Sequence, residues 1–115
     1  MSEPTIFDKI LAKEIPSEAV YEDEHVYAFR DISPQAPVHV LVIPRKRMQS
    51  FADLQHADPS VVASFMQGVS KAAAKLGLEE GGYRVVFNTG SDALQTVPYI
   101  HAHILGGRKL GWPPG

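Results

Sequence analysis

The stretch YIHAHILGG, residues 99–107, places two histidines two positions apart in an otherwise apolar run that ends in a glycine pair. In a β-strand, successive side chains alternate between the two faces of the sheet. A strand over 99–105 therefore directs His101 and His103 to the same face, beside Tyr99. The other face is expected to enter the core under the helices and carries Ile100, Ala102 and Ile104.

The rest of the chain predicts helices and strands around this stretch. A polar loop, TGSDALQT (89–96), precedes it, and the tail GGRKLGWPPG (106–115) is too rich in glycine and proline for regular structure. The remaining patterns predict, in chain order, a helix over 5–15, a hairpin of 19–21 with 26–30, a strand over 38–44, a helix over 59–76 and a strand over 83–88. This order is typical of an α+β fold with a mostly antiparallel sheet.

Both predicted helices carry recognisable end signals. Thr5 and Asp8 have the spacing of a capping box at the start of the first helix. Its apolar face is expected to combine Ile6, Ile10 and Leu11, with Phe7 beside them. Asp58 is the expected N-cap of the second helix, and Gly77 follows its last turn. The apolar stripe of that helix indicates a core face and comprises Val61, Val62, Phe65, Val69, Ala72, Ala73 and Leu76.

The composition fits one compact domain, which we place at 1–115. The chain has 115 residues and a formal net charge of −2, so we expect neither nucleic acid nor an anionic membrane as a partner. Arg45, Lys46 and Arg47 are expected to be solvated. The chain has no cysteine, which excludes disulfides and a cysteine zinc site. No secretory signal or apolar span of ~20 residues is present, so we expect a cytoplasmic protein.

The histidine pair predicts a functional site, because two polar rings on an apolar strand each need hydrogen-bond partners. His39, in the strand over 38–44, is more often structural when considered alone, but it reaches the pair if the two strands are neighbours. Imidazoles act as nucleophiles, as acid–base groups or as metal ligands. His39, His101 and His103 together would offer three nitrogen ligands to zinc.

The residues before the pair favour phosphate chemistry. Asn88 ends the preceding predicted strand, and Gly90, Ser91 and Thr96 lie in the connecting loop. Loop N–H groups, a hydroxyl and an amide can bind a phosphate on a chain that is not basic overall. No acidic residue follows the pair, which counts against an iron site built from two histidines and a carboxylate.

Four separated motifs closely resemble the histidine-triad (HIT) family: IFDKILAKEIPSE, AFRDISPQAPVHVLVIP, NTGSDALQTVPYIHAHILGGR and the terminal WPPG. The similarity is to the branch of purine nucleoside phosphoramidases, or histidine-triad nucleotide-binding proteins. It implies a five-stranded antiparallel sheet with two helices, and a homodimer with a continuous sheet and residues 106–115 at the interface. It also implies hydrolysis of purine nucleoside phosphoramidates through a nucleotidyl-histidine, without a metal or other cofactor.

The resemblance also implies roles for individual residues. His101 matches the nucleophile, His103 the last histidine, which contacts the phosphate, and His39 the upstream histidine. Asp31 matches the acid that holds the ribose hydroxyls. The family's phosphate contacts match Asn88, Thr96 and the Val97 N–H. The apolar walls of its base pocket match Phe7 and Ile32, and a tail residue that reaches the partner's site matches Trp112.

The chain departs from the family at one position, because Tyr99 stands where the first histidine of the triad is expected and Pro98 precedes it. The main-chain carbonyl of Tyr99 can still accept a hydrogen bond from the nucleophile. Its hydroxyl is expected to bond to His39 in place of the missing imidazole, which makes Tyr99 a fourth candidate catalytic residue. Three hypotheses follow: a hydrolase that uses His101, a purine nucleotide sensor that has lost turnover, and a metal protein.

Overall fold

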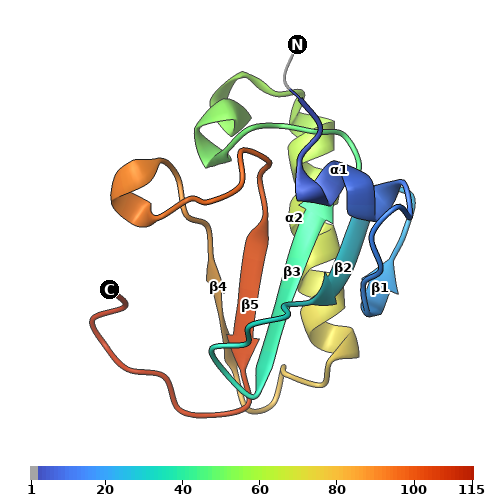
Figure 1. The fold of residues 1–115 in the computed structure, drawn as a ribbon. Coiled ribbons are helices and arrows are strands. Elements are labelled where there is room, and N and C mark those ends of the chain that lie inside the picture. Colours follow the sequence, from blue (N-terminus) through green and yellow to red (C-terminus); the bar gives the residue numbers. More distant parts are fainter. Residues whose placement is uncertain (1–2) are drawn as a thin grey trace.

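A computed structural model describes residues 3–115 and contains one five-stranded antiparallel sheet with strand order β1-β2-β3-β5-β4 (Figure 1). The α+β prediction with two α-helices is therefore confirmed. The elements, in chain order, are α1 (Ile6–Leu11), β1 (Ala19–Glu22), β2 (Val26–Arg30), β3 (Val38–Pro44), the 3₁₀ helix η1 (Phe51–His56), α2 (Pro59–Lys75), β4 (Tyr83–Val86), the 3₁₀ helix η2 (Ser91–Ala93) and β5 (Ala102–Gly106).

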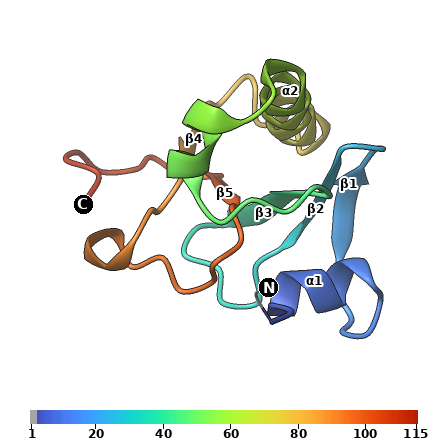
Figure 2. The ribbon, with the colours of Figure 1, turned by 90° about the horizontal axis from the view of Figure 1, so that it is seen from above.

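The two α-helices lie on opposite faces of the sheet, as the view from above shows (Figure 2). The α2 face holds the larger apolar cluster, whose buried members are Val26, Ala28, Val40, Val42, Phe65, Val69, Ala72, Ala73, Leu78, Ile100, Ala102 and Ile104. The α1 face holds Phe7, Ile10, Tyr27, Phe29, Leu41, Ile43 and Tyr99. The predicted alternation along 99–104 is thus confirmed, but its apolar residues lie under α2 alone and not under both helices.

Helix α1 starts as predicted and ends early. The Asp8 N–H donates to Oγ1 of Thr5, and the Thr5 N–H donates to the Asp8 carboxylate, which forms the expected capping box. Lys13 has φ 62°, and the N–H groups of Lys13 and Glu14 bond back to the carbonyls of Ile10 and Lys9. This pattern closes a helix C-terminus, so the helix stops at Leu11. On the predicted apolar face Ile10 is buried with Phe7, whereas Ile6 is 45% exposed.

The strand predicted over 99–105 begins only at Ala102 and extends to Gly106. The backbone before it bonds to loops instead of to β3: the Tyr99 N–H donates to Val97 O and the Ile100 N–H to Met48 O, at 2.8 and 2.7 Å. His101 therefore lies immediately before the strand, at the point where the chain leaves the sheet. Likewise, β4 ends at Val86, two residues before the predicted limit.

Helix α2 packs closely on β2 through Gly68. A Cβ at position 68 would lie 2.6 and 2.7 Å from the two Cγ atoms of Val26, whose side chain is fully buried. Such distances are shorter than a van der Waals contact, so the absence of a side chain sets the spacing between helix and sheet. This spacing positions the sheet whose opposite face carries the histidines.

We predict that Gly68→Ala lowers the free energy of unfolding by about 1 kcal/mol. Overpacking costs about 1–3 kcal/mol, which exceeds the gain of about 1 kcal/mol from replacing a helical glycine by alanine. Urea denaturation measures the change, and Ser70→Ala on the exposed side of α2 is the control, expected within about 0.5 kcal/mol of the parent. A Gly68→Ala protein more stable than the parent would contradict the packing argument.

Candidate active site

Three histidines from neighbouring segments meet on the α1 face of the sheet. β3 pairs with β5 in a register that places Leu41 opposite His103 and His39 opposite Leu105. The ring centroid of His103 lies 5.2 Å from that of His39 and 5.0 Å from that of His101. The expectation that His39 joins the pair when its strand is adjacent is therefore confirmed.

The ring of His101 is oriented by the main chain. Its Nδ1 lies 2.7 Å from the carbonyl oxygen of Tyr99. Since a carbonyl only accepts hydrogen bonds, Nδ1 carries the proton and the neutral ring keeps its lone pair on Nε2. The ring of Phe7 packs edge-on against the imidazole at a centroid distance of 4.9 Å. This arrangement presents Nε2 as a nucleophile or general base.

A second chain of hydrogen bonds fixes the tautomers of the other two histidines. The Gln35 N–H donates to Nδ1 of His39 at 3.0 Å, so the neutral His39 ring carries its proton on Nε2. That Nε2 lies 2.9 Å from Nδ1 of His103, which must accept. His103 is left with its proton on Nε2, a buried atom that has no hydrogen-bond partner within residues 3–115. A buried donor without a partner indicates a place where a ligand binds.

All three imidazoles are held uncharged by their surroundings. Burial lowers the pKa of His101, and the bond to Tyr99 and the negative charge of Asp31 oppose this only in part. Burial lowers the pKa of His39 as well, again against Asp31. For His103, burial and the two neighbouring imidazoles lower the pKa to about 4. At neutral pH the site therefore contains a free imidazole lone pair and an N–H donor, both on neutral rings.

The loop between β2 and β3 positions the acid predicted at the site. Oδ2 of Asp31 lies 3.5 Å from Nε2 of His39, and Oδ1 accepts the Ser33 N–H at 2.7 Å. The same loop supplies the Gln35 N–H, and Nη2 of Arg108 donates to the Gln35 carbonyl at 3.1 Å. Gln35 is not among the predicted site residues, because its contribution is a backbone group and no side-chain pattern marks it. Ile32, the predicted wall of a base pocket, is 96% exposed.

The predicted phosphate-binding residues lie around the start of β5. Asn88 is half-buried and follows β4 in the direction of His101, since β4 runs antiparallel to β5 with Val86 opposite His103. Thr96 and Val97 line a cavity together with Arg47 and residues of the start of α1. No polar contact joins Asn88 or Thr96 to the histidines among the described hydrogen bonds. Phe7 is buried against His101.

Gln95 shapes the loop before β5 and was not predicted. Its Oε1 accepts the Gly90 N–H at 3.0 Å, and its Nε2 donates to the carbonyls of Gln49 and Val97. The loop is thereby closed on itself and tied to the segment before η1. The predicted tail residue Trp112 is 80% exposed, and its ring lies against Arg84 of β4 in its own chain.

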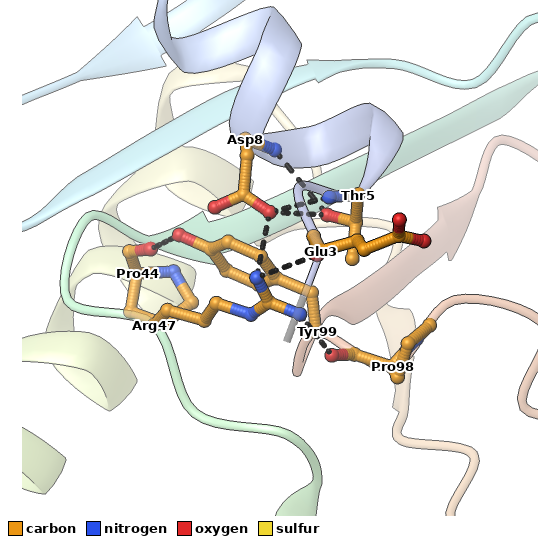
Figure 3. A network of polar contacts seen from close by, with 7 residues as sticks. All are labelled: Glu3, Thr5, Asp8, Pro44, Arg47, Pro98 and Tyr99. Carbon is orange, nitrogen blue, oxygen red and sulfur yellow. Dashed lines mark hydrogen bonds and ion pairs between the residues drawn. The ribbon is translucent and has the colours of Figure 1, made fainter. Parts of the chain in front are cut away.

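The predicted hydrogen bond between the Tyr99 hydroxyl and His39 is wrong. Tyr99 is fully buried in the α1-face cluster, and its hydroxyl donates to the carbonyl of Pro44 (Figure 3). The ring packs against Phe7 at 5.9 Å, so it points toward α1, while His39 lies at the far end of β3 from Pro44. The carbonyl of Tyr99 does accept from His101 as expected. Tyr99 therefore reaches the site through its main chain.

The sheet order and the cluster of three neutral imidazoles define a small α+β protein with a histidine site on one face of its sheet. The family model of the HIT domain matches residues 12–110, and the chain belongs to the HIT family. A 14 kDa zinc-binding protein of Zea mays is 51% identical over 97% of this chain and 88% of its own length. The adenylylsulfatase HINT1 of Arabidopsis thaliana is 47% identical over 97% and 77%.

The fold is also that of a solved HIT family structure. The crystal structure of a HIT family hydrolase from Legionella pneumophila Philadelphia 1 superposes with a TM-score of 0.90. It is 46% identical, and the match covers 97% of this chain and 100% of the Legionella chain. The similarity thus extends over nearly the whole molecule, including both faces of the sheet.

The name of the maize relative prompts a test of the histidines as zinc ligands. Among residues 3–115, the group with metal-ligating geometry is Asp31, His39 and His103, and it omits His101, contrary to the metal hypothesis. Nε2 of His39 and Nδ1 of His103 are 2.9 Å apart. Two nitrogens bound to one tetrahedral zinc at about 2.0–2.1 Å would lie about 3.4 Å apart. This pair therefore fits a shared proton better than a shared zinc ion.

We predict that the parent protein loses stability between pH 6.5 and about 4, in part through His103. The unfolded chain binds a proton at the ordinary histidine pKa of about 6.5, whereas folded His103 titrates at about 4. Its contribution is therefore complete above pH 6.5 and is lost as the pH falls through this window. Urea denaturation of His103→Gln should show a fall smaller by about 3 kcal/mol.

The control for this experiment is His56→Gln, which removes an exposed histidine on η1. It should keep the pH dependence of the parent protein. An identical acid profile for His103→Gln and the parent would show that His103 is not held neutral by the fold.

Proposed function

We propose that the chain hydrolyses purine nucleoside phosphoramidates and related nucleoside monophosphate derivatives through a nucleotidyl-histidine intermediate at His101. The observation that carries this proposal is the pairing of a free Nε2 lone pair on His101 with an unpartnered, buried Nε2–H on His103. The first is a nucleophile. The second is a donor that lacks an acceptor, and a phosphoryl oxygen supplies one.

The reaction proceeds in two displacements at phosphorus. Nε2 of His101 forms a bond to the phosphorus, the phosphorus–nitrogen bond to the leaving amine breaks, and the amine takes a proton from water. Water then attacks the phosphorus and the bond to Nε2 of His101 breaks, which releases the nucleoside monophosphate. The proton lost by this water neutralises the hydroxide left by the first step, and the ring is again neutral. His103 donates to a phosphoryl oxygen as negative charge develops there, with His39 holding its tautomer. No step requires a metal.

The remaining residues of the proposal hold the nucleotide. Asp31 binds the ribose hydroxyls, and its carboxylate is already oriented by Ser33. The apolar walls of the base pocket are assigned to Ile32, which is 96% exposed, and to Phe7, which packs edge-on against His101. The phosphate contacts are assigned to Asn88, Thr96 and the Val97 N–H. Two relatives support the class: the Legionella protein is a hydrolase by name, and the Arabidopsis protein is named for cleavage of an adenylyl sulfate.

The assembly proposed is a homodimer that continues the sheet through β4. The sheet has two edges, β1 and β4. The register of β1 is interrupted by a bulge between Ala19 and Tyr21, which discourages strand addition. β4 is regular, and the irregular tail 107–115, with exposed Trp112, lies next to it. In this assembly Trp112 reaches the partner's site, and the chain acts as one cytoplasmic domain over 1–115.

The structure has no helix long and apolar enough to cross a bilayer within residues 3–115.

We predict that light scattering gives twice the chain mass of 12.6 kDa at micromolar concentration. A continuous sheet buries the backbone groups of β4 and the side chain of Trp112, which favours a stable pair. Dilution measurements extend the test to lower concentrations. A mass of one chain throughout the range would contradict the proposed dimer.

We predict that His101→Ala abolishes turnover of an adenosine phosphoramidate while nucleoside monophosphate binding persists, because only the nucleophile is removed. The matched control is His56→Ala, whose exposed imidazole lies on η1 and which should keep the parental rate. In the parent, kcat/KM should remain high well below pH 6.5, since burial lowers the pKa of His101. Parental turnover by His101→Ala would refute the assignment.

Tyr99, in place of the first histidine, motivates one alternative: a purine nucleotide sensor without turnover. Mass spectrometry of the parent protein mixed with substrate separates the two functions. A nucleotidyl adduct on His101, or released product, identifies the enzyme. Tight nucleotide binding with neither adduct nor product identifies the sensor.

A further inference from the structure

The carbonyl of Tyr99 decides which nitrogen of His101 is free, yet the sheet does not hold this carbonyl. Tyr99 and Ile100 precede β5, and their N–H groups bond to Val97 and Met48 in loops. Pro98 has no N–H to contribute. The position of the Tyr99 peptide must therefore come from contacts outside the ladder of sheet hydrogen bonds.

One end of the tyrosine is anchored by its hydroxyl. The hydroxyl donates to the carbonyl of Pro44 at the end of β3, and the side chain is fully buried. Burial raises the pKa of Tyr99 to about 12, so the phenol keeps its proton and remains a donor. This anchor fixes the ring, and the Ile100 N–H, which donates to Met48 O at 2.7 Å, holds one side of the peptide that carries the Tyr99 carbonyl.

Arg47 adds a further constraint on the N-terminal side of Tyr99, although the sequence predicted a solvated residue. It is half-buried, and its guanidinium carbon lies 5.7 Å from the centroid of the Tyr99 ring. Its Nη2 donates to the Pro98 carbonyl at 3.4 Å, one peptide before Tyr99 (Figure 3). The guanidinium thus covers the ring and reaches the backbone of the same segment, from the loop that follows β3.

Arg47 is itself held by the start of α1. Its Nη1 lies 3.0 Å from Oδ2 of Asp8 and 3.2 Å from the Glu3 carbonyl. The same Oδ2 accepts the Thr5 N–H at 2.6 Å and the Thr5 hydroxyl at 2.9 Å. The carboxylate that completes the capping box is therefore also the anchor of the arginine, as Figure 3 shows.

We propose that Arg47, fixed by Asp8, is a positioning residue that holds the Pro98–Tyr99 segment and thereby keeps His101 in the tautomer with its proton on Nδ1. Among the described hydrogen bonds, those of Arg47 go to Asp8, the Glu3 carbonyl and the Pro98 carbonyl, and none goes to a histidine. Its effect passes through the Tyr99 carbonyl. The consequence for rate rests on the proposed function, whereas the consequence for the tautomer of His101 does not.

The test combines nitrogen NMR of His101 with kinetics in Arg47→Ala. The parent should show a protonated Nδ1 and an unprotonated Nε2 in the ligand-free protein. Arg47→Ala should shift population to the other tautomer, and kcat for an adenosine phosphoramidate should fall at least about tenfold with KM within about twofold. A misplaced group remote from the chemistry can cost up to about 10²-fold in rate.

Two further variants make the result specific. Arg45→Ala is the matched control, because Arg45 pairs with Glu22 and the Asp23 carbonyl and should leave tautomer and kcat as in the parent. Arg47→Lys keeps the charge but loses the fork that reaches Asp8 and Pro98 together. It should therefore show the same tautomer shift, and it replaces Arg47→Ala if that protein does not fold.

The outcomes separate the inference from the function on which it builds. An unchanged His101 tautomer in a folded Arg47 variant overturns the positioning role, whatever the kinetics. A parent protein that does not hydrolyse the phosphoramidate overturns the proposed function, and the NMR comparison still decides the role of Arg47. Equal tautomer shifts in the Arg47 and Arg45 variants would also overturn the inference, because the effect would then be one of charge alone.

Discussion

The hydrogen bond between Nδ1 of His101 and the carbonyl of Tyr99 joins the fold of this protein to its chemistry. An imidazole has two nitrogens, and a neutral ring protonated on one nitrogen has its lone pair on the other. At position 101 the main chain makes this choice, because a carbonyl accepts and does not donate. The free nitrogen follows from the path of the backbone before β5, and any residue at position 99 can provide the oxygen. This explains how a tyrosine can occupy the place of the first triad histidine.

The tautomers of His39 and His103 are also set by a backbone group, which in their case is an N–H donor. The Gln35 N–H sets His39, and His39 sets His103. The Tyr99 carbonyl and the Gln35 N–H thus determine which ring nitrogen carries the proton in histidines that lie one or two hydrogen bonds away. Burial keeps the rings neutral, so the pattern of donors and lone pairs persists at physiological pH. In the proposed reaction these neutral donors meet an oxygen-rich, anionic group, as suits a chain of net charge −2.

One face of the sheet carries most of the apolar core, and the other face carries the histidines. α2 covers one face and supplies most of the apolar core, with Gly68 allowing close packing on Val26. The shorter α1 covers only part of the other face, and the histidines lie where its apolar cluster ends, with Phe7 in contact with His101. α1 also brings Asp8 to Arg47, so the helix that bounds the site is tied to the segment before His101.

The sequence by itself determined the element order, the capped helices and the alternation that separates His101 and His103 from Ile100, Ala102 and Ile104, because these depend on local periodicity and turn chemistry. Its four motifs also identified the family. Tertiary structure alone decided that β5 begins at Ala102, that the Tyr99 hydroxyl bonds to Pro44 and not to His39, and that Arg47 is packed against Tyr99. It also revealed Gln35 and Gln95. The physical reason is that these contacts join groups distant in sequence or use the backbone, whose hydrogen bonds leave no mark in the order of the side chains.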